Sequence, residues 1–225
     1  MNEDQRPTPQ APDAYPAYAR AERRADAVMH VLGLAFALIG GAILIPFTAL
    51  FEGGARTAAV SVYCAALLAS FLASTLYHFP PRDTLRPLLR RFDYAAIFLK
   101  IAGTYTPLVV LIGSAFAYGV LAVVWAVALL GAGLRLFFWR TPGPLGPLLY
   151  LGLGWASLAL VWSLFPVLPL AAALLVVAGG VLYSLGVLFF RMETLRYSMA
   201  IWHGFVLAAS ACFFTAISLG TFLAA

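Results

Sequence analysis

Long apolar runs separated by short breaks make up most of this chain. Each run is long enough to cross the hydrocarbon core of a bilayer, which takes about 20 residues in a helix. The breaks are rich in proline, glycine and arginine, as is typical where helices end. The pattern predicts an all-α membrane protein, a bundle of seven transmembrane helices within residues 19–225. The seven runs cover residues 27–50, 57–79, 94–113, 115–138, 146–165, 168–190 and 199–223.

The least distinct break lies between the third and fourth runs, at Gly113, Ser114 and Ala115. A single helix across this break would be about twice as long as a membrane span. We therefore predict a tight turn at these residues.

Composition supports a membrane location. Of the 225 residues, 63% are hydrophobic and only 10% are charged, whereas a soluble domain has about 25% charged residues. The first 26 residues are polar and rich in proline and alanine, without the apolar stretch that a cleavable signal peptide needs. Residues 1–18 are predicted to be a disordered tail.

The arginines indicate the orientation, because cytoplasmic loops of membrane proteins collect positive charge. With seven spans, twelve arginines fall on one side and Arg56 alone falls on the other. The N-terminus is therefore predicted to be cytoplasmic and the C-terminus extracytoplasmic. The net charge of +5 then reflects topology, and we expect no nucleic-acid partner. The twelve are Arg6, Arg20, Arg23, Arg24, Arg82, Arg86, Arg90, Arg91, Arg135, Arg140, Arg191 and Arg196.

Ionisable side chains within the apolar runs form a short list, and such residues are costly in a membrane unless they have a function. Under the predicted orientation, four of them lie at a similar depth near the cytoplasmic face: His30, His78, Asp93 and His203. They come from four parts of the sequence that are far apart. Their shared depth indicates one site, although polar residues also prefer this interfacial depth without any site.

Imidazoles, a carboxylate and a hydroxyl are the components of a zinc site. His78 and His203 would bind the metal, and Asp93 would orient a bound water or take its proton. Ser74 lies four residues before His78 and therefore on the same helical face, one turn deeper. We predict that Asp93 and Ser74 are catalytic residues.

Several segments, taken in order, resemble the haemolysin III family, bacterial relatives of the progestin and adipoQ (adiponectin) receptors. The resemblance spans about residues 20–215. It rests on Glu22 with the stretch 27–33, the SxxxH motif of 74–78, DYAAIFLKIAGTYTP at 93–107, YSLGVLFF at 183–190 and IWHGFVLAAS at 201–210. The resemblance implies seven helices, a cytoplasmic N-terminus and residence in the bacterial inner (plasma) membrane. It also implies a zinc held by three histidines, with a water held by the aspartate.

One position departs from the family pattern. The last family motif is usually HxxxH, and this chain has Met199 where the first of these histidines is expected. A thioether is a poor zinc ligand, so the resemblance assigns only His78 and His203 as metal ligands. Zinc could bind weakly with water or Asp93 completing the site, His30 could be the third ligand, or the metal could have been lost.

Lys100 is a second departure, because the resemblance implies an apolar residue there. It lies seven residues after Asp93, on nearly the same helical face and about 10 Å further along the axis. One interpretation is a snorkelling lysine whose ammonium reaches the interface. The other is a positive charge that compensates for a missing or weakly bound metal.

Glu22, Asp26 and His30 form one stripe, at i, i+4 and i+8, on the helix that enters the membrane. With Arg23 and Arg24 beside it, this stripe is interpreted as solvated or facing the lipid headgroups. The alternative is that Glu22 contributes to the cytoplasmic mouth of the site.

Two functions follow from these residues, and both have membrane lipid as the partner. The first is a zinc-dependent hydrolase acting on a lipid amide or ester at the cytoplasmic leaflet. The second is a non-enzymatic sensor or regulator of membrane lipid, in which the metal site is structural or degraded. A proton or ion pathway is the weakest interpretation, because the outer halves of the helices contain few polar groups.

Overall fold

The computed structural model describes residues 18–138, 145–192 and 194–223, and all regular structure in these ranges is helical. Seven helical segments of this part are long and apolar enough to cross a membrane. The predicted bundle of seven transmembrane helices is therefore confirmed. Residues 1–17 of the predicted disordered tail lie outside the described residues.

The helices extend beyond the apolar runs at several ends. The first begins at Arg20 and the third at Arg86, because a helix continues through polar residues that hydropathy does not count. The fifth span is divided into two α-helices with a 3₁₀ segment between them. The elements are α1 (Arg20–Phe51), α2 (Gly54–His78), η1 (Asp83–Leu85), α3 (Arg86–Ile112), α4 (Ala115–Phe137), α5 (Leu145–Trp155), η2 (Ala156–Leu160), α6 (Val161–Leu164), α7 (Leu170–Arg191) and α8 (Ser198–Leu223).

The turn predicted between the third and fourth spans is present. Gly113 ends α3 with φ of 68°, a left-handed conformation that glycine adopts without strain. Ser114 follows as the N-cap of α4, and its hydroxyl accepts a hydrogen bond from the amide of Ala117 at 3.2 Å. The chain therefore reverses direction within two residues.

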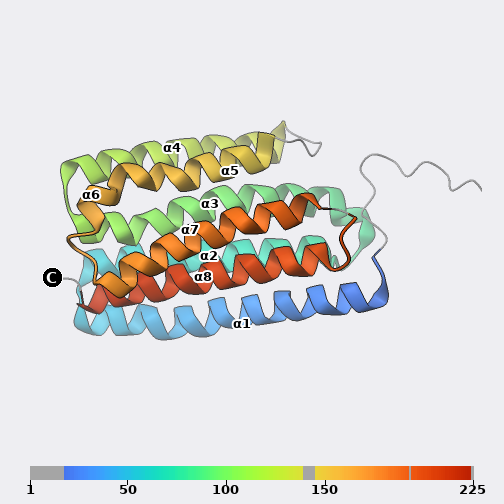
Figure 1. Cartoon of the computed structure of the whole chain (residues 1–225), viewed down its shortest axis with the longest axis horizontal. Helices are drawn as coiled ribbons and strands as arrows, with labels where there is room; N and C mark the ends of the chain where they lie inside the picture. Colours follow the sequence, from blue (N-terminus) through green and yellow to red (C-terminus); the bar gives the residue numbers. More distant parts are fainter. Residues whose placement is uncertain (1–17, 139–144, 193, 224–225) are drawn as a thin grey trace, which may run out of the picture.

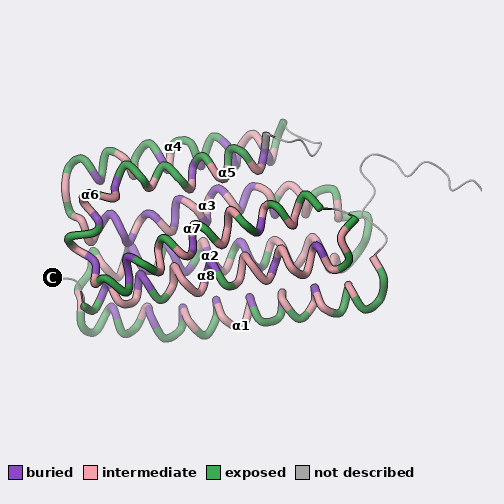
Figure 2. Tube along the Cα trace, viewed as in Figure 1, coloured by how far each residue is buried: buried purple, intermediate pink, exposed green. Residues whose placement is uncertain are grey.

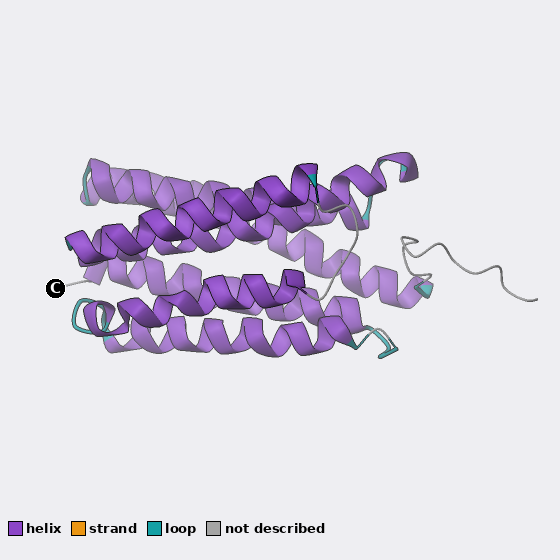
Figure 3. Ribbon diagram, turned by 90° about the horizontal axis from the view of Figure 1, so that it is seen from above, coloured by secondary structure: helices purple, strands orange, loops and turns teal. Residues whose placement is uncertain are grey.

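The helices lie roughly along one long axis, and the chain leaves α8 at the end of the bundle opposite to the start of α1 (Figures 1 and 3). We call the end where α1 begins the N-terminal end of the bundle. Helices α2, α3 and α8 lie between α1 on one side and the α4–α5 pair on the other. The outer faces of α1 and α4 are exposed along their length (Figure 2), and their exposed residues are largely apolar, as expected for helices surrounded by lipid.

Small residues allow the helices to approach closely, as is common in membrane bundles. A Cβ on Gly103 would lie 2.7 Å from the Cβ of Ala66, so α2 and α3 pack backbone to backbone there. A Cβ on Gly131 would lie 2.6 Å from the ring of Phe98, which is fully buried. Gly133, two residues further along α4, has no neighbour within 4 Å of such a Cβ.

Candidate metal centre

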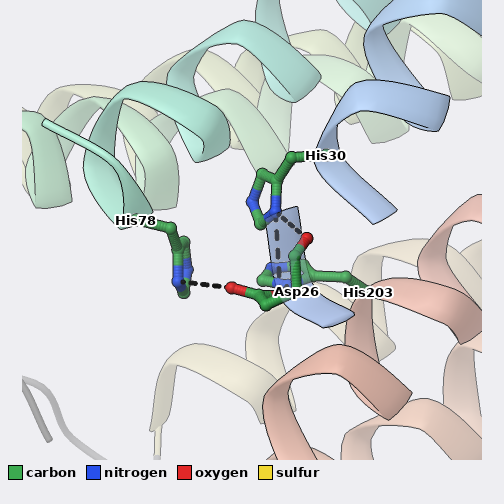
Figure 4. Close-up of side chains that lie close together, drawn as sticks. All are labelled: Asp26, His30, His78 and His203. Atoms are coloured by element: carbon green, nitrogen blue, oxygen red, sulfur yellow. Dashed lines mark hydrogen bonds and ion pairs between the residues drawn. The ribbon is translucent and has the colours of Figure 1, made fainter. Parts of the chain in front are cut away.

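The three histidines of the chain meet at the N-terminal end of the bundle (Figure 4). His30 lies nearly three turns into α1, His78 is the last residue of α2, and His203 lies in the second turn of α8. Their ring centroids are 4.3 to 5.1 Å apart, and all three side chains are buried. Three helices that are distant in sequence therefore bring every imidazole of the protein to one point.

Asp26 lies at the centre of this group and is itself buried. Its Oδ1 accepts a hydrogen bond from Nδ1 of His203 at 2.5 Å, and its main-chain oxygen accepts one from Nδ1 of His30 at 2.8 Å. Its Oδ2 lies 3.5 Å from Nδ1 of His78. One residue of α1 thus orients all three rings, in the way that carboxylates and carbonyls orient the histidine ligands of metals.

The partners of Asp26 determine which ring nitrogens remain available. A carbonyl oxygen can only accept, so His30 bears its proton on Nδ1 and has a lone pair on Nε2. The hydrogen bond that Nδ1 of His203 donates to the carboxylate likewise leaves a lone pair on Nε2 of that ring. Both Nε2 atoms face the hydroxyl of Ser74, at 3.4 and 3.5 Å. A single hydroxyl has one proton for two lone pairs, whereas a cation could be bound by both.

The cluster of Asp26, His30, His78 and His203 fits the requirements of zinc. One donor atom from each residue lies within 4.8 Å of all the others. Donors in tetrahedral zinc sites lie about 2.0–2.1 Å from the metal and hence about 3.3 Å from one another. A contraction of the cluster by side-chain adjustment would therefore form the site. Three imidazole nitrogens are a donor set that zinc binds, and a carboxylate that orients the rings commonly accompanies it.

A cavity of about 720 Å³ adjoins the cluster and continues toward the middle of the bundle. Ser74 and Asp93 border it beside the histidines, and Asp93 is buried. Met199 and Lys100 also line it. A carboxylate and a hydroxyl therefore face a space large enough for part of a lipid, next to a group of potential metal ligands.

The structure brings together the residues that the sequence proposed for the site. His78 and His203 are in contact, and Asp93 and Ser74 adjoin them. His30 contacts both of the other histidines, whereas the sequence allowed it only as a substitute ligand. Met199 lies in the wall of the cavity that adjoins these residues.

One interpretation of the sequence is wrong. Asp26 and His30 do not face solvent or headgroups, since their side chains are 4% and 3% exposed. Asp26 is the residue that sequence reasoning missed. Asp26 lies four residues before His30, on the same face of a membrane-spanning helix. That spacing could have indicated that Asp26 belongs to the site.

Glu22, the first residue of the same stripe, connects α1 to the segment that precedes α8. Its Oε1 accepts a hydrogen bond from the amide of Tyr197 at 2.9 Å, and its Oε2 accepts one from the amide of Ala19 at 2.9 Å. Tyr197 has φ of 63°, which is uncommon for a residue other than glycine. Glu22 thus stabilises a strained turn just before the helix that contains His203.

The fold and the cluster define a class: an integral, multi-pass membrane protein of seven helices with a buried aspartate–histidine group that could hold a metal at one end. Residues 20–214 match the model of the haemolysin-III related family. The chain is 34% identical to hemolysin-3 of Bacillus cereus over 194 residues, 86% of this chain and 89% of that protein. It is 32% identical to the hemolysin-3 homolog of Bacillus subtilis (strain 168) over 196 residues, 86% and 91% of the two chains. The chain belongs to the haemolysin III family.

Proposed function

We propose that this protein is a metal-dependent hydrolase of a lipid amide or ester at the cytoplasmic leaflet of the bacterial inner membrane. The observation that supports this most is the position of the histidine cluster, buried at the wall of a large cavity beside Asp93 and Ser74. The orientation rests on the arginine asymmetry of the sequence. Under it, the N-terminal end of the bundle is cytoplasmic.

The residues divide into three roles. His30, His78 and His203 would hold the metal, with Asp26 keeping their rings in place. A bound zinc supplies Lewis acidity and lowers the pKa of a water. Asp93 is placed to accept a proton from a water in the cavity, and the Ser74 hydroxyl is placed to donate a hydrogen bond to a carbonyl oxygen of the substrate.

The walls of the cavity support a lipid as the substrate. Leu158 of η2, Phe165 after α6 and Val177 of α7 line it and are also exposed on the outside of the bundle. In a membrane this outside is occupied by acyl chains. An acyl chain could therefore pass between the fifth and sixth spans and place a carbonyl group near Asp93 without leaving the bilayer.

Turnover by purified protein in phosphatidylcholine nanodiscs tests this proposal. An N-acyl sphingoid base and a diacylglycerol are supplied as probe amide and ester, and released fatty acid is measured by mass spectrometry. We expect release that stops on chelation, returns with zinc, and falls at least about 100-fold in Asp93→Asn, the loss of a general base being worth 10² or more. The matched control is Asp83→Asn, an exposed carboxylate paired with Arg86 at the same end. No release from either probe by zinc-loaded protein, or undiminished release by Asp93→Asn, would contradict the proposal.

The non-enzymatic alternative is favoured by one observation. Asp26 ties α1, α2 and α8 together through three histidines, which is also what a structural site would do. In that case His78→Ala would lower the melting temperature, and zinc-loaded wild-type protein would release no fatty acid. The two functions therefore differ in turnover by the wild-type protein, independently of any variant.

A further inference from the structure

Lys100 is the only lysine of the chain and lies inside the membrane-spanning part of α3. Its side chain is 7% exposed and lines the cavity. Its Nζ lies 5.0 Å from the ring centroids of both Phe71 and Tyr183, from α2 and α7. The ammonium is therefore held inside the bundle between two aromatic faces, in place of snorkelling to the interface.

The two rings that flank the ammonium are fixed. Phe71 packs against Gly33 of α1, where a Cβ would lie only 2.6 Å from the ring. Tyr183 is hydrogen-bonded through its hydroxyl to Ser210 of α8 at 2.9 Å. Four helices thus position the aromatic pair around Lys100. The surroundings of its ammonium are therefore formed before any ligand enters.

Among the described residues, the Lys100 ammonium has neither a hydrogen-bond acceptor nor an ion-pair partner; its contacts are the two rings. Asp93, seven residues earlier on the same helix, has an electrostatic interaction with Lys100 but forms no ion pair with it. Cation–π contacts offset only part of the cost of removing a charge from water. A buried cation in a membrane protein normally has an anionic or carbonyl partner, and here the cavity is the space from which one could come.

We propose that the cavity binds a long-chain amphiphile whose carboxylate pairs with Lys100, at a subsite separate from the histidine cluster. One ammonium balances one carboxylate, and its three N–H donors can reach both oxygens. Apolar side chains, including Leu108 and Val176, also line the cavity and suit the hydrocarbon chain. This binding requires neither a metal nor turnover, so it stands or fails separately from the proposed hydrolase.

Binding of radiolabelled oleate to the full chain in phosphatidylcholine nanodiscs tests the subsite, with empty nanodiscs as the baseline. We expect Lys100→Met, which keeps the volume and removes the charge, to bind oleate at least about tenfold more weakly, because a hydrogen bond to a charged group is worth at least that factor. Lys100→Arg should retain most of the affinity. Oleyl alcohol, which has the same chain without the charge, should bind wild type and Lys100→Met equally.

Arg90 is the matched control, because it lines the same cavity nearer the N-terminal end of the bundle. We expect Arg90→Met to bind oleate like wild type. Oleate binding that is unchanged in Lys100→Met, or that is lost in Arg90→Met alone, would overturn the proposal by placing the carboxylate elsewhere.

A second measurement needs no variant. With a single lysine, protein labelled with ¹³Cε-lysine gives one side-chain resonance, which reports the charge state and surroundings of Lys100. We expect this resonance to show a protonated amine and to shift saturably with oleate but not with oleyl alcohol. A neutral amine throughout, or a resonance that oleate does not move, would refute the pairing even if Lys100→Met failed to fold.

Discussion

Replacing Asp26 by asparagine tests the central feature of the metal centre. The substitution keeps the shape of the side chain and removes the charge that accepts the hydrogen bond from His203 and faces His78. Loss of such an orienting partner typically weakens metal binding 10- to 100-fold, or about 1.4 to 2.8 kcal/mol. Because Asp26 contacts all three histidines, we expect the upper end of this range.

The expected difference is large enough to measure as thermal stabilisation. Zinc at 100 times its dissociation constant stabilises the wild-type protein by about 2.7 kcal/mol. At the same zinc concentration, a variant with 100-fold weaker binding would gain only about 0.4 kcal/mol. Melting curves of the detergent-purified protein with and without zinc, together with competition against a chromophoric chelator, give both quantities.

Asp83→Asn is the control, because Asp83 is exposed and its only described charged contact is with Arg86. It should bind zinc like wild type. If Asp26→Asn also bound zinc as tightly as wild type, Asp26 would not orient the ligands and the account of the site given above would be refuted. Equal and weak binding by all three proteins would instead show that the histidines do not form a zinc site.

Three further predictions concern other parts of the molecule. Met199→His, one turn before His203, restores the histidine that the family pattern contains and should raise zinc affinity at least about tenfold by chelator competition; unchanged affinity would show that residue 199 cannot reach the metal. Glu22→Ala should lower the melting temperature, because the amide of Tyr197 loses its hydrogen-bond acceptor, whereas Glu22→Gln should melt nearer to wild type. Gly131→Ala should destabilise by about 1–3 kcal/mol through overpacking against a buried ring, whereas Gly133→Ala should be neutral or stabilising; equal melting temperatures would contradict the packing of α4.

Much of the architecture followed from local features of the chain. The apolar runs predicted seven spans because lipid requires each crossing segment to be apolar over about 20 residues. The combined length of the third and fourth runs predicted the turn between α3 and α4, since one helix across Gly113 and Ser114 would be about twice as long as a membrane span. The shared depth of His30, His78 and His203 indicated one site, because depth depends only on the distance of a residue from the end of its span.

The tertiary structure decided which side chains face one another. Asp26 appeared solvated from its neighbours Arg23 and Arg24, yet the rotation of α1 turns it toward α2 and α8. That rotation depends on how all the helices pack, which no single segment determines. For the same reason the sequence could place His30 near the site but could not show that its ring contacts both His78 and His203.

Lys100 also shows which features followed from the sequence and which depended on the packing of the helices. The sequence by itself determined that a lone lysine lies within a membrane span, which is costly wherever it occurs. Only the packing of α2, α3 and α7 determined that its ammonium lies between Phe71 and Tyr183 at the wall of a cavity. Hydropathy and helix depth are properties of each segment in its solvent, so the sequence was sufficient for them. The metal centre and the cavity are formed by faces of several helices, and they exist only once those helices have packed.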